Sequence, residues 1–149
     1  MIIEKQSLLE SVLRLTKPQE DEKGVIVRRG VLLSKDGAFL VHYTDNLDTL
    51  YKMLDCETID IVTRNVKGKP FDFVVDDEGR MKRNHVQAVS SDGNEWLLGN
   101  ILIAGFCDEN GDLTDIDDTD LGRIIQCLRV STEKSPYWTA KAILVYDLY

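Results

Sequence analysis

Short strand-like segments alternate with turns that contain glycine, asparagine or acidic residues between residues 58 and 111. The segments are TIDIVTRNV, FDFVVDD, HVQAVSS and EWLLGNILIAGF, at residues 58–66, 71–77, 85–91 and 95–106. The breaks fall at residues 67–70, 77–79, 91–94 and 110–111. Turns of this kind between β-rich segments are typical of antiparallel sheet. We therefore expect a meander of antiparallel strands in this part of the chain.

The flanking segments predict further strands and three short helices. Residues 24–43 hold two apolar runs joined at Ser34–Gly37, which indicates a hairpin, and residues 139–149 indicate a last strand. Apolar residues at helical spacing predict a first helix over Glu4–Leu15 and a second from a cap at Asp45 or Asn46 to about Leu54. The third helix is expected to begin at Asp117, Asp118 or Thr119 and to contain Leu121, Ile124, Ile125 and Leu128. This order of elements predicts an α+β fold, mostly antiparallel β-sheet with about three short helices.

Length and composition indicate one globular domain. The chain has 149 residues, of which 43% are hydrophobic and 30% charged. A domain of this size buries roughly 70% of the surface of its unfolded chain, so it can form a substantial core. We expect a single domain over residues 1–149, because neither an internal repeat nor a linker interrupts the sequence.

The charge balance and the cysteines restrict the partners and the compartment. A net charge of -8 argues against binding to nucleic acid or to anionic membranes, since neutralising phosphates needs a surplus of Lys and Arg. Glu4 and Glu10 interrupt the apolar N-terminal run, and no run approaches the ~20 residues that span a bilayer. The cysteines have neither disulfide-framework nor zinc-site spacing: Cys56, Cys107 and Cys127. We expect a protein of a reducing cytoplasm, without membrane contact, metal or cofactor.

The stretch FCDENGDLTDIDDTD, residues 106–120, contains seven carboxylates and no basic residue. It could be a metal loop, a catalytic site, a surface that imitates a negatively charged molecule, or a solvated turn and helix cap. An EF-hand that began at Asp108 would have Leu113 where the loop needs Gly and Thr119 where it needs Glu, so calcium is not favoured. The turn and the cap account for most of these carboxylates, and their excess leaves a negative field.

That excess predicts a site for a partner with a basic surface. The candidate residues are Asp112, Asp115, Asp117, Asp118 and Asp120, with Asp76, Asp77 and Glu78 as a second patch.

Two basic clusters offer a different site. They are Arg64, Lys67 and Lys69, and then Arg80, Lys82 and Arg83 beside His85. If the strands between them pair, these side chains could meet on one face and bind phosphate. Alternatively, they are solvated turn residues that keep the sheet edges from aggregating.

The sequence gives no constellation for catalysis. His42 and His85 are the only histidines, and neither has a nearby cysteine in the sequence. Glycine-rich phosphate loops of the Walker or dinucleotide type are absent from the sequence. We therefore expect no enzyme and name no catalytic residue.

One long segment carries a family resemblance. Its elements are Asp76–Gly79 followed by Lys82, the strand Leu98–Ile103, and Asp112-Leu113-Thr114 ahead of an acidic helix start. In these elements the segment resembles the domain of unknown function 3846, a family of bacterial, phage and mobile-element proteins, and the resemblance covers about residues 46–121. The resemblance implies a small α+β domain from phage-like or integrated elements and transfers no catalytic residue. It divides the chain into an N-terminal helix and hairpin (1–45), a recognised α+β region (46–128) and a C-terminal strand extension (129–149).

Two hypotheses of different classes follow. The first is a non-enzymatic binding protein of a phage or mobile element, an inhibitor of a host defence protein that acts through an acidic surface. The second is a small-molecule or nucleotide-binding domain that uses the basic turn residues. An enzyme and a structural subunit of a phage particle rank below both.

Overall fold

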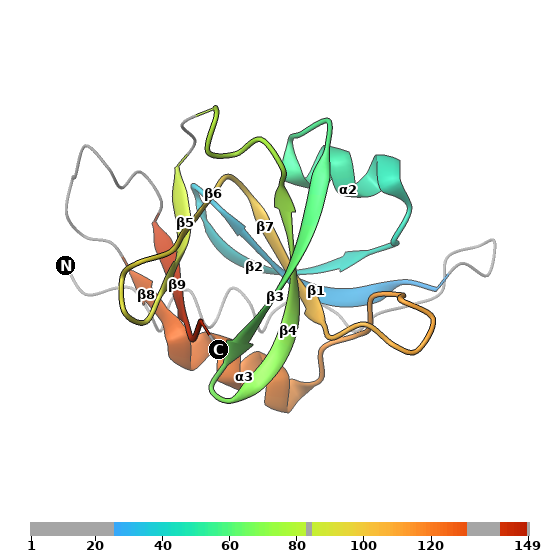
Figure 1. The fold of residues 1–149 in the computed structure, drawn as a ribbon. Helices are drawn as coiled ribbons and strands as arrows, with labels where there is room; N and C mark the ends of the chain where they lie inside the picture. The colour runs from blue at the N-terminus through green and yellow to red at the C-terminus, as the bar shows by residue number, and fades with distance from the viewer. Residues whose placement is uncertain (1–25, 83–84, 131–140, 149) are drawn as a thin grey trace.

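Two β-sheets pack face to face in the computed structural model, which describes residues 26–82, 85–130 and 141–148 (Figure 1). The larger sheet contains, in spatial order, β2 (Gly37–Tyr43), β1 (Arg28–Ser34), β7 (Ile101–Gly105), β4 (Lys69–Asp76) and β3 (Ile59–Val66). The smaller sheet contains β6 (Trp96–Leu98), β5 (Val86–Ser90), β9 (Ala142–Tyr146) and β8 (Leu128–Val130). The helices are α2 (Leu47–Leu54) and α3 (Asp118–Cys127). The fold is α+β and mostly antiparallel, as the sequence predicts.

The prediction of a simple meander is wrong at β7. Residues 95–106 form two strands instead of one, because the chain turns at Gly99, whose φ of 84° is in the left-handed region that favours glycine. The first part, β6, pairs with β5 in the smaller sheet, while β7 inserts between β1 and β4 in the larger one. The pair β5·β9 is parallel. The third helix was predicted to contain Leu128, but α3 ends at Cys127 and Leu128 is the first residue of β8.

The two-residue turn Lys67-Gly68 fixes the register of the β3–β4 hairpin. Both residues have positive φ, 54° and 81°, as a type I′ turn requires, and they join the paired residues Val66 and Lys69. The same register continues for eight residues and places Ile59 opposite Asp76. The start of β3 and the end of β4 therefore lie side by side at the open end of the hairpin.

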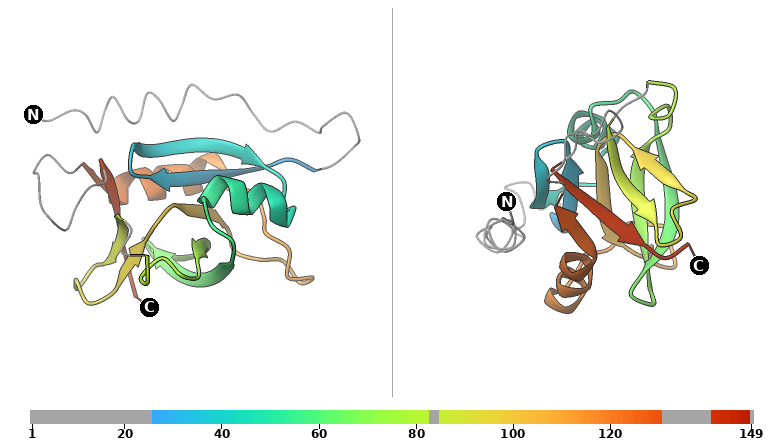
Figure 2. Two further views of the ribbon diagram at one scale, coloured as in Figure 1. Left: turned by 90° about the horizontal axis from the view of Figure 1, so that it is seen from above. Right: turned by 90° about the vertical axis from the view of Figure 1, so that its left-hand side faces the viewer.

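The main core lies between the two sheets and under α3. Phe71, Phe73 and Val75 of β4 point into it, and the ring of Phe73 meets Tyr146 of β9 edge to face with centroids 5.6 Å apart. Figure 2 shows the smaller sheet and the larger sheet as separate layers. Because successive side chains of a strand point to opposite faces, Val74 faces the other way, into the second core.

That second core lies between the larger sheet and α2. Asn46 is the N-cap of this helix, and its side chain accepts hydrogen bonds from the backbone N–H groups of Asp48 and Thr49. The helix buries Leu50 and Leu54. The predicted capping position is therefore confirmed. The two helices cover opposite faces of the larger sheet, α2 at the top and α3 at the bottom of Figure 1. The helix expected over residues 4–15 and most of the N-terminal segment lie outside the described residues.

Candidate interaction surface

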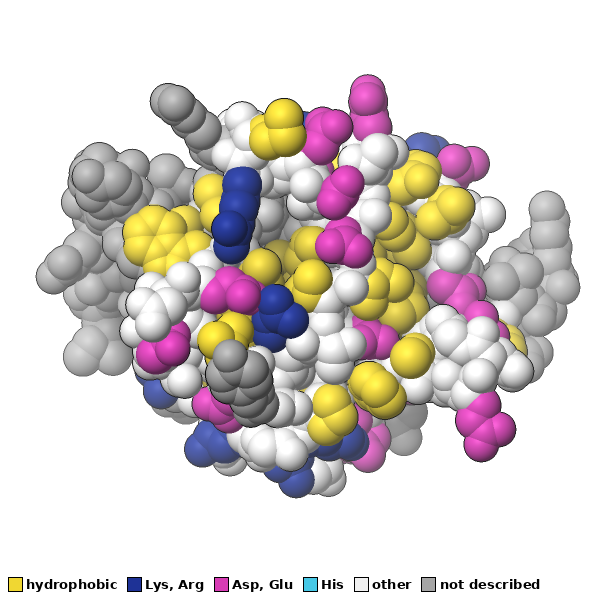
Figure 3. Space-filling view, in the orientation of Figure 1, with side chains coloured by type: hydrophobic (Ala, Val, Ile, Leu, Met, Phe, Trp, Pro, Cys, Tyr) yellow, Lys and Arg dark blue, Asp and Glu magenta, His cyan; other side chains and the backbone are white. Residues whose placement is uncertain are grey.

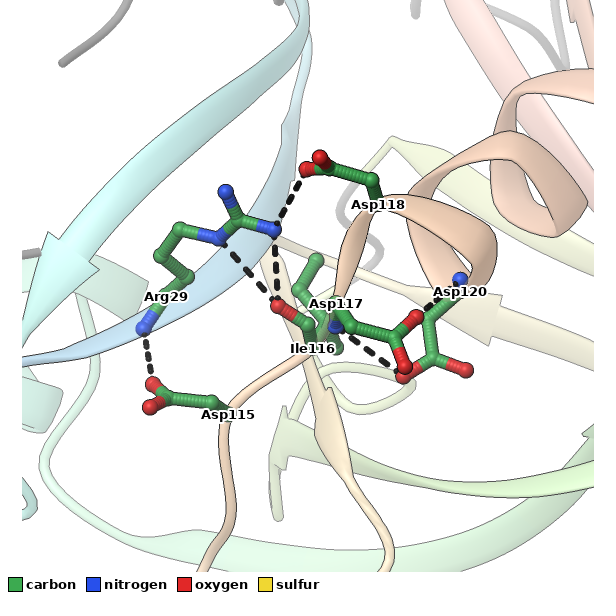
Figure 4. Close-up of polar contacts among 6 residues, drawn as sticks. All are labelled: Arg29, Asp115, Ile116, Asp117, Asp118 and Asp120. Atoms are coloured by element: carbon green, nitrogen blue, oxygen red, sulfur yellow. Dashed lines mark hydrogen bonds and ion pairs between the residues drawn. The ribbon is translucent and has the colours of Figure 1, made fainter. Parts of the chain in front are cut away.

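Arg29 of β1 holds the acidic segment that precedes α3 (Figure 4). Its guanidinium donates from Nε and Nη2 to the carbonyl of Ile116, at 3.2 and 2.9 Å, and Nη2 also lies 3.0 Å from Oδ1 of Asp118. Its backbone N–H donates to Oδ1 of Asp115 at 2.7 Å. Two of the predicted partner-binding carboxylates thus have a partner inside the chain.

Asp117 and Asp120 form the N-terminal cap of α3. Oδ1 of Asp117 accepts from the backbone N–H of Asp120 at 2.7 Å, and Oδ2 of Asp120 accepts from that of Asp117 at 3.1 Å, a capping box. The hydrogen bond from the Asp120 N–H lowers the pKa of Asp117. The Asp120 side chain is only 5% exposed and also pairs with Lys69.

The expectation of an anionic surface open to a partner does not hold for Asp118 and Asp120, which pair with Arg29 and Lys69, whereas Asp115 and Asp117 are exposed and have no ion pair with a described residue. Each of the four binds backbone N–H groups or a cationic side chain of its own chain. These contacts satisfy carboxylates that the sequence shows only as a negative run. Asp112, in the turn before them, is exposed and has no cationic partner among the described residues.

The second predicted patch lies at the open end of the β3–β4 hairpin. Asp76 is buried and accepts from Nζ of Lys82 at 3.0 Å and from the backbone N–H of Glu78 at 2.9 Å. Asp77 and Glu78 are exposed beyond the end of β4. Asp77 donates its backbone N–H to the carbonyl of Thr58 at 3.1 Å, which joins this turn to the start of β3.

That connection assembles five exposed carboxylates from two separate parts of the sequence. We name them the acidic end: Asp55, Glu57, Asp60, Asp77 and Glu78. None of them has an ion pair with a described residue, although Lys52 and Lys82 line the same surface hollow as Asp55, Glu57 and Glu78. Figure 3 shows acidic side chains running down the upper middle of this face, over the start of β3. Sequence reasoning missed the first three, and only the strand register could have added them.

The basic residues do not gather into one site. Three of these residues form ion pairs: Arg64 with Glu95, Lys69 with Asp120, and Lys82 with Asp76. A fourth, Arg80, donates a hydrogen bond to the backbone carbonyl of Trp96. Lys67 is an exposed turn residue at the far end of the hairpin, and Arg83 lies outside the described residues. Only Arg64 and Arg80 of this set line a common cleft. The ion pairs neutralise the charge that a phosphate would need.

That cleft opens between the two sheets, beside β3. It has a volume of about 230 Å³. Its lining contains apolar side chains, those of Val62, Val75, Leu97 and Leu98, and charged ones, those of Asp60, Arg64, Asp76, Asp77, Arg80 and Glu95. In Figure 3 apolar side chains lie between acidic and basic ones in this region.

A polar network lies at the cleft and includes two of its lining residues, Arg64 and Glu95. Oε1 of Glu95 lies 2.6 Å from Nη2 of Arg64 and accepts from the hydroxyl of Tyr146 at 2.8 Å. Burial alone would raise the pKa of Glu95, but the hydrogen bonds from Tyr146 and Arg64 outweigh it and lower the pKa. Burial and the bond to Glu95 raise the pKa of Tyr146. The network keeps Glu95 ionised and joins the smaller sheet to β3.

Histidine and cysteine side chains do not come together for nucleophilic chemistry. Nε2 of His85 lies 3.2 Å from Oδ1 of Asn100, and burial lowers the pKa of this histidine. Burial also raises the pKa values of the Cys56 and Cys107 thiols, with nearby Asp76 and Asp72 adding to the effect. Both thiols are thereby kept protonated, which disfavours them as nucleophiles.

Two further observations concern metals and membranes. Within the described ranges, no group of three or more His, Cys, Asp or Glu side chains is arranged to hold a metal ion. No helix in the described part of the chain is long and apolar enough to cross a membrane.

Comparison with known proteins identifies a family for the chain. A family model described as domain of unknown function (DUF3846) matches residues 27–129. The match begins within the N-terminal hairpin, so it extends further toward the N-terminus than the resemblance over residues 46–121. No curated protein matches the chain, and no solved structure does.

Proposed function

The chain belongs to the DUF3846 family, and on this premise we propose that it is a non-enzymatic binding protein of a phage or mobile element. Its partner is a host protein with a basic surface, and the contact is made by the acidic end. The single observation that carries this proposal is the set of exposed carboxylates at the open end of the β3–β4 hairpin, which have no ion pair with any described residue.

Exposed apolar side chains on β3, on β6 and in the turn after Glu78 support the proposal. Met81 is 82% exposed in the turn after Glu78, and Ile61 is 46% exposed on β3. Trp96 is 38% exposed on β6, and it lines a shallow hollow together with Arg80. Apolar and aromatic side chains supply most of the affinity of protein interfaces, while the surrounding charges speed encounter and fix orientation.

The specific form of the proposal is inhibition of a host defence protein. In this form the acidic end occupies a basic groove that otherwise holds nucleic acid. Support comes from the resemblance to a family of phage and mobile-element proteins, together with the negative charge of the whole chain, -8. A negative surface competes for such a groove because both ligands are attracted by the same lysines and arginines.

The experiment compares two variants with the same change in net charge. The acidic-end variant carries Glu57→Gln, Asp77→Asn and Glu78→Gln, and the control variant carries Asp36→Asn, Glu109→Gln and Asp112→Asn. All six carboxylates are exposed, so neither set removes a buried contact. Proteins captured from the native host are identified by mass spectrometry, and the purified partner is then titrated with both variants at low and high ionic strength.

We expect the acidic-end variant to bind the purified partner about tenfold or more weakly at low salt, whereas the control binds as the unmodified protein does. Equal affinity of both variants would remove the acidic end from the interface. If only the control variant lost binding, the partner would bind at the segment around Asp112 instead of at the acidic end. For the inhibitor form, the partner's own activity is measured with and without the protein, and an unchanged activity contradicts it.

A further inference from the structure

The outer edge of β3 presents main-chain groups that no strand of the described chain covers between Ile59 and Thr63. The even-numbered residues pair with β4, because the turn joins Val66 to Lys69 and the Thr58 carbonyl accepts from Asp77. The odd-numbered residues therefore point away from the sheet. Asn65 confirms this direction, since its carbonyl accepts from the backbone N–H of Asp147 beyond the end of β9.

Side chains guard part of this edge. Oδ1 of Asp60 accepts from the backbone N–H of Ile61 at 2.9 Å, and Nη1 of Arg64 donates to the carbonyl of Thr63 at 2.8 Å. The carbonyl of Ile61 and the N–H of Thr63 make no hydrogen bond with any other described residue. Side chains that bond to the main-chain groups of an edge strand keep that edge from pairing with other chains and aggregating. Such a side chain can rotate away without any change to the sheet. The two side chains therefore oppose pairing with an arbitrary strand. A segment with complementary side chains can still pair with the carbonyl of Ile61 and the N–H of Thr63.

The two faces beside the edge differ in chemistry. On one face Ile61 is an exposed apolar residue. On the other face Asp60 and Val62 lie at the inter-sheet cleft, whose lining combines apolar side chains with the carboxylates of Asp77 and Glu95 and with the guanidinium groups of Arg64 and Arg80. A strand laid along β3 would place its alternate side chains against these two different surfaces.

We propose that an extended segment of a partner protein adds to the edge of β3 as a further strand, with lysine or arginine alternating with β-branched or apolar residues. This inference rests on the proposed function and names the binding mode at the same surface. The basic side chains enter the cleft, where the aliphatic stem lies on Val62 and Leu97 and the cationic head meets the carboxylates of Asp60 and Asp77. The apolar side chains lie over Ile61.

The dimensions of the site set the length and form of the segment. Asp147 already occupies the edge at Asn65, so the open part covers Ile59 to Thr63. The cleft holds about 230 Å³, which suits a side chain rather than a helix. Main-chain hydrogen bonds to Ile61 and Thr63 give affinity in this mode, and the alternating side chains give specificity.

The experiment uses the full chain, labelled with ¹⁵N, and a synthetic peptide that alternates lysine with valine. Two control peptides have the same composition: one has its lysines and valines in separate blocks, and the other carries N-methyl groups on the valine amides. We expect the alternating peptide to shift the amide resonances of Ile61 and Thr63 and to slow hydrogen exchange at Thr63. We expect both controls to bind about tenfold more weakly, because they lose the pattern or the main-chain hydrogen bonds.

Variants of the protein give an independent readout. Ile61→Pro removes one outward N–H and leaves the β3–β4 hydrogen bonds in place, so the chain should fold and bind the alternating peptide more weakly. Asp60→Asn with Asp77→Asn should weaken peptide binding at low salt, whereas Asp36→Asn with Asp112→Asn should not. If the proline variant fails to fold, the N-methylated peptide still tests the main-chain contacts.

Three outcomes would overturn the inference. They are equal binding of the N-methylated peptide, amide shifts confined to residues away from β3, and concentration-dependent dimerisation through β3 in the absence of peptide, which would assign the edge to a second copy of the chain. Each is distinguishable from failure of the proposed function. If the purified partner does not bind the acidic-end variant but still binds the Ile61→Pro variant, the acidic end remains the interaction surface. That result contradicts only the addition of a strand to β3.

Discussion

Arg64 on β3 and Glu95 before β6 join the two sheets through an ion pair with Nη2 and Oε1 2.6 Å apart. The two residues are 31 positions apart in the sequence. Tyr146 of β9 donates to the same carboxylate oxygen at 2.8 Å. Two strands, β3 and β9, and the residue before β6 thus meet at one partly buried polar network beside the inter-sheet cleft. The contribution of this network to stability can be measured.

We expect Tyr146→Phe to lower the free energy of unfolding by about 1–2 kcal/mol, because a hydrogen bond to a charged group is lost while the ring stays packed against Phe73. Urea unfolding followed by circular dichroism measures the change. The matched control is Tyr51→Phe: this tyrosine is half-buried, and no hydrogen bond of its hydroxyl to a described residue is observed. Equal effects of the two substitutions would contradict a stabilising role for the network.

The pH dependence of stability should report the ionisation of Glu95. Its pKa in the folded protein is lowered by Tyr146 and Arg64, which outweigh burial, so the unfolded chain takes up the proton more readily. The resulting stabilisation is fully present above the ordinary pKa of a glutamate, about 4.3, and is lost as pH falls through the lower pKa of the folded state. Urea midpoints measured from neutral pH to about pH 3 should fall less steeply for Glu95→Gln than for the unmodified protein. Parallel curves would show that Glu95 titrates as it does in the unfolded chain.

Arg29 and Asp118 should contribute unequally although they form one ion pair. The Asp118 side chain is 92% exposed, so Asp118→Ala should cost less than about 1 kcal/mol. Arg29→Ala should cost about 1–3 kcal/mol, because it removes both donors to the Ile116 carbonyl and the packing of a mostly buried side chain. Denaturant midpoints of the two variants test this order, and the reverse order would contradict it.

The capping box should make Asp117 important for α3. Asp117→Ala removes the acceptor for the Asp120 N–H and should cost about 1 kcal/mol. Asp117→Asn, which keeps an acceptor oxygen at the cap, should retain most of the stability. A loss of the same size in both variants, measured by thermal unfolding, would attribute the effect to charge at the helix start instead of to the hydrogen bond.

A panel of nucleotides should leave the thermal unfolding temperature unchanged. Arg64, Lys69 and Lys82 are each paired with a carboxylate of the chain, so a phosphate would have to displace an internal partner. A clear upward shift with any nucleotide, abolished in Arg64→Gln or Arg80→Gln, would instead favour the small-molecule hypothesis. The control is Lys67→Gln, which changes an exposed turn residue outside the cleft.

Local signals in the sequence predicted many of the elements correctly. Asn46 and Asp117 are caps because short side chains with an acceptor oxygen suit the first turn of a helix, and this can be recognised without tertiary information. The segments that became β3, β4 and β5 were also identified from their residue types. The turn at Gly99 was missed. A glycine inside an apolar run does not by itself show that the chain changes direction, and here the turn depends on the separate pairing partners of β6 and β7.

The candidate site was predicted less well than the elements. The first acidic cluster was located from its density of carboxylates, but a count of charges does not reveal that Arg29 lies 86 residues away from Asp115 and binds it. Asp77 and Glu78 were named, whereas Asp55, Glu57 and Asp60 were not, because nothing in the sequence places these three beside Asp77 and Glu78. Their proximity depends on the register that begins at Lys67-Gly68 and ends at the pair Ile59 and Asp76.

By itself the sequence determined the acidic composition, the β-rich pattern, the turns and both helix caps, since each depends on residues within a few positions of one another. Tertiary structure alone decided which carboxylates are neutralised and which remain exposed. It also decided that β7 lies between β1 and β4 and that β3 is left at an edge. The reason is physical: ion pairs and strand pairing join residues that are distant along the chain, and only a complete fold fixes those distances.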